Sequence, residues 1–111
     1  MEGYKEIWNA EEVAKLMSEG ALIIDVRAEQ AYHKEHIPGA INIPLAKIEE
    51  AMKDIPRDKT IVVYCGSVEC TMSYMASRKL AASGYENVYR YTPGIKGWKE
   101  SGFKAESSIL Q

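Results

Sequence analysis

The sequence predicts an α/β domain with a central, mainly parallel sheet of about five strands and helices on both faces. Two observations carry this prediction. The apolar runs ALIIDV (21–26) and TIVVYC (60–65) are continuous rather than alternating, which is typical of strands covered on both faces. Segments with helical spacing of apolar residues separate the strand-like runs, which is the pattern of a parallel sheet with crossover helices.

Six elements are predicted in the first half of the chain. In chain order they are a short edge strand (5–8), a helix (9–20), a buried strand (21–26), a short helix (28–36), a short strand (40–43) and a helix (45–55). Asn9 can cap the first helix, Glu12 stands at the capping-box position, and Gly20 can end it. Pro38 and Gly39 predict a turn after the second helix.

Four elements are predicted in the second half. In chain order they are a buried strand (60–65), a helix between residues 72 and 84, a strand (87–91) and a short helix (94–101). The apolar face of the long helix is predicted to consist of Met72, Met75, Ala76 and Leu80. Ile95 and Trp98 are expected to point inward from the short helix.

Length and composition predict one domain over residues 1–111, with a tail from about residue 104 to 111 that is expected to fray. The net charge of −2 and the scattered basic residues predict no nucleic-acid partner. No apolar run approaches the roughly 20 residues of a membrane span, so no membrane partner is predicted. Two cysteines without an export signal favour a reducing compartment, by default the cytoplasm.

Cys65 stands where the second buried strand ends, shortly before a helix. In parallel α/β sheets, binding sites lie beyond the carboxyl ends of the strands, so this cysteine is placed for chemistry. A thiol attacks as the thiolate, and backbone N–H groups at a helix N-terminus favour negative charge. No lysine or arginine lies between Cys65 and Ser77. We therefore predict that the loop lowers the pKa of the Cys65 thiol without help from a basic side chain.

Each cysteine also has a simpler interpretation. Cys65 could merely end a buried strand, since free cysteines are often buried, but its small and polar neighbours favour a functional role. Cys70 follows five positions later. It is either a resolving thiol that attacks a modified Cys65 or a passive residue of the loop, and the sequence leaves both interpretations open.

Three segments resemble the single-domain rhodaneses, in the same order and spacing, and together they cover nearly the whole chain. LIIDVRAEQAYHKEHIPGAINIPL (22–45) is similar to the family's N-terminal signature, IVVYC (61–65) to its catalytic strand and nucleophile, and LAASGYENVYRYTPGIKGW (80–98) to its closing stretch. The resemblance implies a small rhodanese-like domain with a central parallel sheet, which agrees with the pattern of elements.

The resemblance also implies a sulfurtransferase. Cys65 would accept a sulfane sulfur from a small donor such as thiosulfate, a persulfide or a polysulfide, and pass it from a persulfide to a nucleophile. The acceptor could be cyanide, a thiol or a protein cysteine, and a partner protein could supply or receive the sulfur. We expect no cofactor. The loop that would bind the substrate and the persulfide consists of Gly66, Ser67, Val68, Glu69, Cys70 and Thr71.

This loop departs from the family pattern. It reaches Ser73 through two extra residues, and it carries Glu69 and Cys70 where the family often has arginine, which weakens the case for tight binding of a dianion such as thiosulfate. It resembles a subgroup that has a second cysteine in the loop. The closing glycine pair of the family is replaced by Pro93-Gly94, a change that a turn can absorb.

Asp25 and Arg27 end the first buried strand. The simpler interpretation is that they fix loops there by hydrogen bonds, and the alternative is that Arg27 lends positive charge to an anionic substrate. A direct pair between the two side chains is not predicted. His33 and His36 stand three apart without further ligands nearby, so no metal site is predicted.

Three other functions compete with sulfur transfer. A cysteine-based phosphatase or arsenate reductase would need an arginine six positions after the nucleophile to bind an oxyanion, and position 71 is threonine. A non-catalytic sulfur carrier would also need Cys65. A thiol redox switch would use Cys65 together with Cys70. A thiosulfate:cyanide assay separates the enzyme from the carrier, and thiol titration after mild peroxide treatment tests the switch.

Overall fold

The computed structural model describes residues 3–108 and contains a five-stranded sheet in which every strand pairing is parallel. The strands are β1 (Lys5–Ile7), β2 (Leu22–Asp25), β3 (Ile41–Asn42), β4 (Ile61–Tyr64) and β5 (Val88–Tyr91). Their order across the sheet is β1-β5-β4-β2-β3, so the two strong apolar runs form neighbouring strands near the middle. The predicted α/β fold is confirmed.

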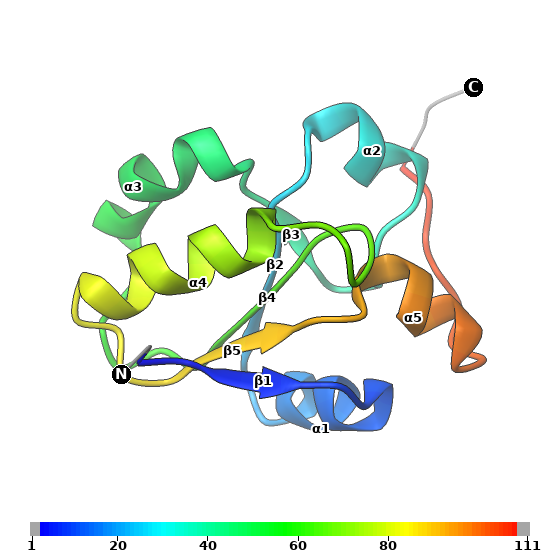
Figure 1. Cartoon of the computed structure of the whole chain (residues 1–111), viewed down its shortest axis with the longest axis horizontal. Helices are drawn as coiled ribbons and strands as arrows, with labels where there is room; N and C mark the ends of the chain where they lie inside the picture. The colour runs from blue at the N-terminus through cyan, green and yellow to red at the C-terminus, as the bar shows by residue number, and fades with distance from the viewer. Residues whose placement is uncertain (1–2, 109–111) are drawn as a thin grey trace.

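Helices cover both faces of the sheet. They are α1 (Ala10–Ser18), α2 (Glu29–Lys34), α3 (Ile48–Ala51), α4 (Met72–Ala82) and α5 (Gly94–Glu100), with 3₁₀ turns η1 (Leu45–Lys47) and η2 (Met52–Asp54) on either side of α3. The helices α3 and α4 lie on one side of the sheet, and α1 and α5 lie on the other (Figure 1). The loop after β4 curls beside the first turn of α5 (Figure 1).

The central strand β4 contributes to both halves of the core. Val63 and the following Cys65 pack in the cluster under α3 and α4, whereas Val62 and Tyr64 pack in the cluster under α1 and α5. All four strand residues are completely buried. Because successive side chains of a strand point to opposite faces, a strand covered on both faces is apolar at every position.

The local signals for α1 are confirmed, whereas the predicted helix over residues 45–55 is not continuous. Asn9 Oδ1 accepts a hydrogen bond from the Glu12 N–H at 3.2 Å, which caps α1. Residues 45–55 form η1, α3 and η2 in succession. Ile48, Met52 and Ile55 are nevertheless buried. The apolar spacing therefore marked the buried side correctly, but it did not distinguish an α-helix from tighter 3₁₀ turns.

The inward face of α4 differs from the prediction at Met75, whose side chain is 43% exposed. The residues of α4 that are buried are Ser73, Ala76, Ser77 and Leu80. Three of these four are small, which lets the helix backbone come close to the sheet. Ala76 and Leu80 are buried as predicted and Met72 packs against the core, so the predicted face is wrong only at Met75 and it missed Ser73 and Ser77.

The segment after α5 is held against α2. His36 and Glu106 exchange two backbone hydrogen bonds of 2.8 Å, and the Ser108 N–H donates to the His33 carbonyl at 2.9 Å. The sequence predicts a frayed tail over 104–111. It cannot show this pairing, because hydrogen bonds between backbone groups leave no apolar pattern in the sequence. Residues 109–111 lie outside the described part of the chain.

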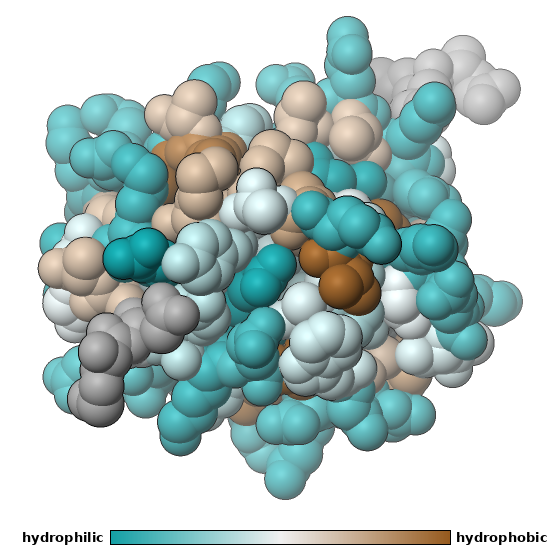
Figure 2. Space-filling view, in the orientation of Figure 1, coloured by the Kyte–Doolittle hydropathy of each residue, from teal (hydrophilic) through white to brown (hydrophobic). Residues whose placement is uncertain are grey.

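The surface view shows a mainly hydrophilic face with small, separate apolar patches (Figure 2). Exposed large apolar side chains belong to residues from different parts of the chain: Trp8, Ile41, Val68 and Met75. Within residues 3–108, no helix has both the length and the apolar character needed to cross a membrane.

Candidate active site

Cys65 directly follows β4 and lies at the start of the loop that leads into α4. The residue is only 1% exposed. Its Sγ atom receives the Ser73 N–H at 3.4 Å, in the first turn of α4, and lies 3.2 Å from Ser73 Oγ. The thiol proton can also be donated to the Cys70 carbonyl, 3.5 Å away. The sulfur therefore sits among polar groups although water hardly reaches it.

The first turn of α5 fixes the backbone on which this sulfur sits. The Ile95 N–H donates to the Cys65 carbonyl and the Lys96 N–H donates to the Gly66 carbonyl, both at 3.0 Å. Gly94 has φ +67°, and a Cβ atom at this position would lie 2.4 Å from the Cys65 carbonyl oxygen. Only glycine permits this close approach, so Pro93-Gly94 does more than form a turn.

The remaining loop residues form a tight, partly exposed turn. The Cys70 N–H donates to the Ser67 carbonyl at 3.1 Å, and Ser67 Oγ donates to Glu69 Oε1 at 3.0 Å. The Ser67 hydrogen bond holds the pKa of the Glu69 carboxyl below its ordinary value. Val68 is half exposed and Thr71 is exposed, without a side-chain capping bond to α4. Ser67 and Glu69 also line, with Lys96, a shallow pocket of about 100 Å³.

The predicted low pKa of Cys65 is wrong for the resting thiol. Burial raises the pKa of Cys65, the neighbouring Cys70 thiol raises it further, and the hydrogen bonds from Ser73 offset only part of the effect. The charged form of a group loses more solvation than the neutral form when it is buried. The sequence could place Cys65 at a strand end but could not show that water would be excluded from it.

Cys70 is the more acidic of the two thiols. Partial burial opposes the ionisation of Cys70. Its pKa is nevertheless held below the ordinary value by hydrogen bonds from the Cys65 thiol and from the backbone N–H groups of Gly66 and Met72, and by the charge of Arg90. Both cysteines are unpaired thiols, and Cys70 is partly exposed. Ionisation of one thiol disfavours ionisation of the other, so the site carries one negative charge more readily than two.

Arg90 of β5 is a site residue that the sequence analysis did not single out. It is 9% exposed, and its guanidinium reaches the start of α4. Nε donates to Ser73 Oγ at 3.0 Å, and Nη2 donates to the Cys70 carbonyl at 3.1 Å. The prediction of a site without a basic side chain is therefore wrong. The available signal was a charged residue inside an apolar strand pattern, NVYRY (87–91).

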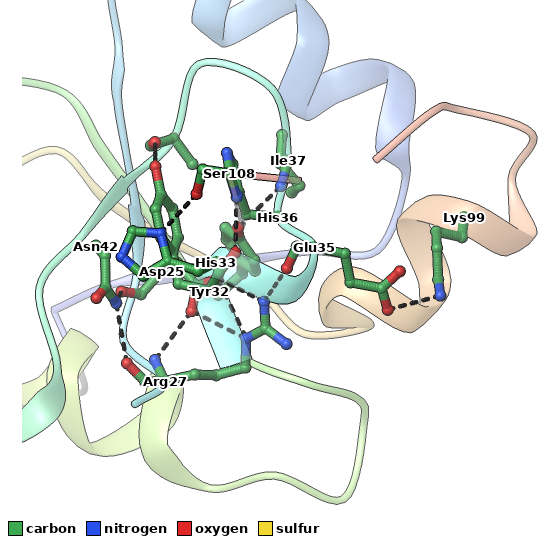
Figure 3. A network of polar contacts seen from close by, with 12 residues as sticks. Asp25, Arg27, Tyr32, His33, Glu35, His36, Ile37, Asn42, Lys99 and Ser108 are labelled. Carbon is green, nitrogen blue, oxygen red and sulfur yellow. Dashed lines mark hydrogen bonds and ion pairs between the residues drawn. The ribbon is translucent and has the colours of Figure 1, made fainter. Parts of the chain in front are cut away.

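Asp25 and Arg27 form a direct pair. Arg27 Nη2 donates to Asp25 Oδ2 at 2.8 Å, and Nε also contacts the same carboxylate. The expectation of no direct pair is wrong, because side chains two positions apart in an extended segment lie on the same side. Arg27 also reaches the Glu35 carbonyl at 2.6 Å (Figure 3). These contacts are the kind expected of residues that fix loops.

The Asp25–Arg27 pair belongs to a wider polar network at the end of β2 (Figure 3). Asn42 of β3 donates to the carbonyls of Asp25 and Arg27 at 3.0 and 2.9 Å. The Tyr64 hydroxyl accepts the Ile37 N–H at 3.0 Å. Within residues 3–108, no three histidine, cysteine, aspartate or glutamate side chains gather in a way that could hold a metal ion.

Comparison with known proteins gives a consistent result. The family model described as "Rhodanese-like domain" matches residues 9–101. The chain is 36% identical over 84 residues to the HTH-type transcriptional regulator Rv0324 of Mycobacterium tuberculosis; the match covers 76% of the chain but only 37% of the regulator. It is 29% identical over 96 residues to the thiosulfate sulfurtransferase GlpE of Coxiella burnetii, covering 86% of the chain and 88% of that protein.

The fold is similar to that of solved structures. The crystal structure of protein BH2092 from Bacillus halodurans superposes with a TM-score of 0.82 at 31% sequence identity, and the match covers 96% of this chain and 78% of that one.

Proposed function

The chain belongs to the rhodanese-like domain family, and from this membership we propose that it is a sulfurtransferase that carries a sulfane sulfur on Cys65. One observation supports the assignment of the nucleophile above the others. Cys65 stands at the carboxyl end of the central strand, and the Ser73 N–H at the start of α4 points at its sulfur from 3.4 Å. A backbone donor at a helix N-terminus favours negative charge on that sulfur.

The proposed reaction has two transfers. The Cys65 thiolate attacks the outer sulfur of thiosulfate, a sulfur–sulfur bond forms, and sulfite leaves with the electron pair of the bond that breaks. Cys65 is then a persulfide anion. A nucleophile such as cyanide attacks its terminal sulfur, takes that sulfur away as thiocyanate and restores the thiolate. No net electron transfer occurs, because sulfane sulfur passes between two nucleophiles.

The loop supplies the groups that would bind the transferred sulfur. The backbone N–H groups from Gly66 to Glu69 are the proposed donors, together with the Ser73 N–H that already contacts Cys65, whereas the Cys70 N–H is already bonded to the Ser67 carbonyl. Glu69 adds an exposed carboxylate at the loop, and Lys96 lies beside the same shallow pocket. Because the carboxylate repels a dianion, we propose that low-molecular-weight persulfides of lower charge are better donors than thiosulfate.

Turnover assays test this function. With cyanide as acceptor, and after subtraction of the rate without protein, the wild-type protein should form thiocyanate from thiosulfate and from a low-molecular-weight persulfide, and faster from the persulfide. Cys65→Ser should lose both activities. A protein that takes up sulfur once but does not turn over would be a sulfur carrier. A protein whose turnover survives in Cys65→Ser would contradict the assignment of the nucleophile.

A thiol switch is a second candidate, because Cys70 lies beside Cys65 and its pKa is lowered. With a Cys65 persulfide, the Cys70 thiolate would attack Sγ of Cys65, form a disulfide and release hydrosulfide. With a peroxide as oxidant, a Cys65 sulfenic acid would condense with Cys70 and release water. Two unpaired thiols at one site fit a reducing compartment, and we propose the cytoplasm.

The Cys70→Ser variant tests the switch. If Cys70 resolves the persulfide, that variant should hold its persulfide longer than the wild type, and only the wild type should form an intramolecular disulfide. Equal persulfide lifetimes and no disulfide would make Cys70 a bystander.

A further inference from the structure

A chain of polar side chains, buried except at Glu6, connects β1 and β5 to the sulfur of Cys65. Thr92 Oγ1 donates to Glu6 Oε2 at 2.7 Å, and Arg90 Nη1 donates to the same oxygen at 3.4 Å. On its other side, Arg90 Nε donates to Ser73 Oγ at 3.0 Å. Ser73 Oγ lies 3.2 Å from Cys65 Sγ. The guanidinium therefore stands one hydroxyl group away from the nucleophile.

The hydroxyl of Ser73 can serve both states of Cys65. A hydroxyl has one proton to donate and two lone pairs to accept with. Arg90 Nε–H occupies one lone pair, and the second can accept the proton of a neutral Cys65 thiol. When Cys65 is anionic, the hydroxyl can turn and donate its own proton to Sγ. Accepting a bond from a cation polarises the hydroxyl and strengthens it as a donor.

The burial of Arg90 fits a role toward an anion. The residue is 9% exposed, and its ion-pair partner Glu6 has a side chain that is 44% exposed. Taking a guanidinium out of water costs free energy that a single contact of 3.4 Å with a half-exposed carboxylate offsets only in part. A negative sulfur on Cys65 would be a second compensating charge, reached through Ser73.

We propose that Arg90 is a positioning residue that acts through the Ser73 hydroxyl to stabilise anionic sulfur on Cys65. This rests on the proposed function in one respect: the anion is the thiolate before sulfur transfer and the persulfide after it. The positive charge that the loop sequence lacks would then come from β5, beneath the loop. Arg90 also fixes the Cys70 carbonyl with Nη2, which keeps the loop over the sulfur.

The test measures how the alkylation rate of Cys65 depends on pH, in a Cys70→Ser background that leaves one thiol. Iodoacetamide is suitable because it is neutral and reacts with the thiolate. Arg90→Gln should move the midpoint to higher pH and slow alkylation at neutral pH about tenfold, the size expected when a charge-assisted hydrogen bond is lost. Arg90→Lys should recover part of the rate.

The matched control is Arg57→Gln. Like Arg90, Arg57 donates to a backbone carbonyl, that of Ser83, and to a hydroxyl, that of Tyr85. Ser83 follows the last residue of α4, so Arg57 contacts the end of α4 that lies away from Cys65. This control should leave the alkylation profile of Cys65 unchanged. An equal shift in Arg57→Gln would attribute the effect to general destabilisation and overturn the proposal.

Ser73→Ala separates an effect through the hydroxyl from a merely structural effect of Arg90. Ser73→Ala alone should shift the profile as Arg90→Gln does, and the double variant should shift it little further. An unchanged profile in Ser73→Ala would overturn the proposal even if Arg90→Gln did not fold, and so would fully additive shifts. Alkylation needs no sulfur donor, so a wild type that never forms a persulfide would refute the proposed function and leave this test intact.

Discussion

At the scale of single residues, the two neighbouring thiols differ in how readily they ionise. Cys65 is buried and its pKa is raised, first by burial and then by Cys70. Cys70 is partly exposed, and the Cys65 thiol and two backbone N–H groups hold its pKa below the ordinary value. The resting site is therefore best described as a neutral Cys65 beside a Cys70 that ionises first.

This description predicts the order in which the thiols react. At neutral pH, iodoacetamide should label Cys70 before Cys65 in the wild type, because the thiolate is the reactive form. Labelling of Cys65 should rise only as the pH passes the ordinary thiol value of about 8.5. Peptide mapping by mass spectrometry after short exposures checks the order. Faster labelling of Cys65 at neutral pH would contradict it.

Sequence reasoning singled out Cys65 as the candidate nucleophile but did not predict its surroundings. Cys65 could be singled out because a strand run ends there and a helix pattern follows. The exclusion of water from Cys65, the Arg90 contacts and the burial of Ser73 and Ser77 depend on how β5 and α4 pack, which no local pattern encodes. The direct Asp25–Arg27 pair was not predicted, although side chains two positions apart in an extended segment lie on the same side and can meet.

At the scale of elements, the first turn of α5 holds the start of the loop after β4 in place, and we call this contact the α5 clamp. Its N–H groups bind the carbonyls of Cys65 and Gly66, and Gly94 permits their close approach. The closing glycine pair of the family corresponds to Pro93-Gly94 in this chain. The close approach to the Cys65 carbonyl explains why glycine is needed at the second of these two positions. The helix at residues 94–101 and its inward Ile95 and Trp98 could be predicted, but the clamp could not.

Gly94→Ala should loosen this clamp. Any non-glycine residue at this left-handed φ costs about 1–3 kcal/mol, and the clash with the Cys65 carbonyl adds a further cost of about 1–3 kcal/mol. The control is Gly102→Ala, where φ is +91° but no atom lies within 4 Å of the added Cβ. Denaturant unfolding should show a larger loss of stability in Gly94→Ala. Equal losses in the two variants would mean that the close approach has no energetic weight.

At the scale of the whole molecule, the parallel sheet holds two polar centres at the ends of adjacent strands. Cys65 follows β4, and Asp25 and Arg27 stand at the end of β2, its neighbour in the sheet. Tyr64 lies between the two centres. It directly precedes Cys65 as the last residue of β4, and the charge of Asp25 acts on its hydroxyl and raises its pKa. The continuous apolar runs predicted a mainly parallel sheet but not the order of its strands. The pairing of β1 with β5 needed the structure.

Tyr64 makes the stability of the whole fold sensitive to alkaline pH. Burial, followed by the charge of Asp25, raises the pKa of Tyr64 in the folded state. The stability that this contributes is present below the unfolded value of about 10 and is lost as the pH rises above it, because the unfolded chain releases the proton more readily. Tyr64→Phe should therefore flatten the decline of the unfolding free energy above pH 10. An unchanged decline would contradict the assignment.

The account depends on one sulfur atom at one residue, and mass spectrometry tests this directly. After exposure to polysulfide and removal of the reagent, the intact mass of the wild type should rise by one sulfur, and dithiothreitol should reverse the gain. Peptide mapping of Cys70→Ser, which removes the thiol that ionises first, should place the sulfur on Cys65, and the Cys65→Ser/Cys70→Ser double variant should gain none. A Cys70→Ser variant that gains no sulfur, or a wild type whose sulfur maps only to Cys70, would contradict the proposed role of Cys65.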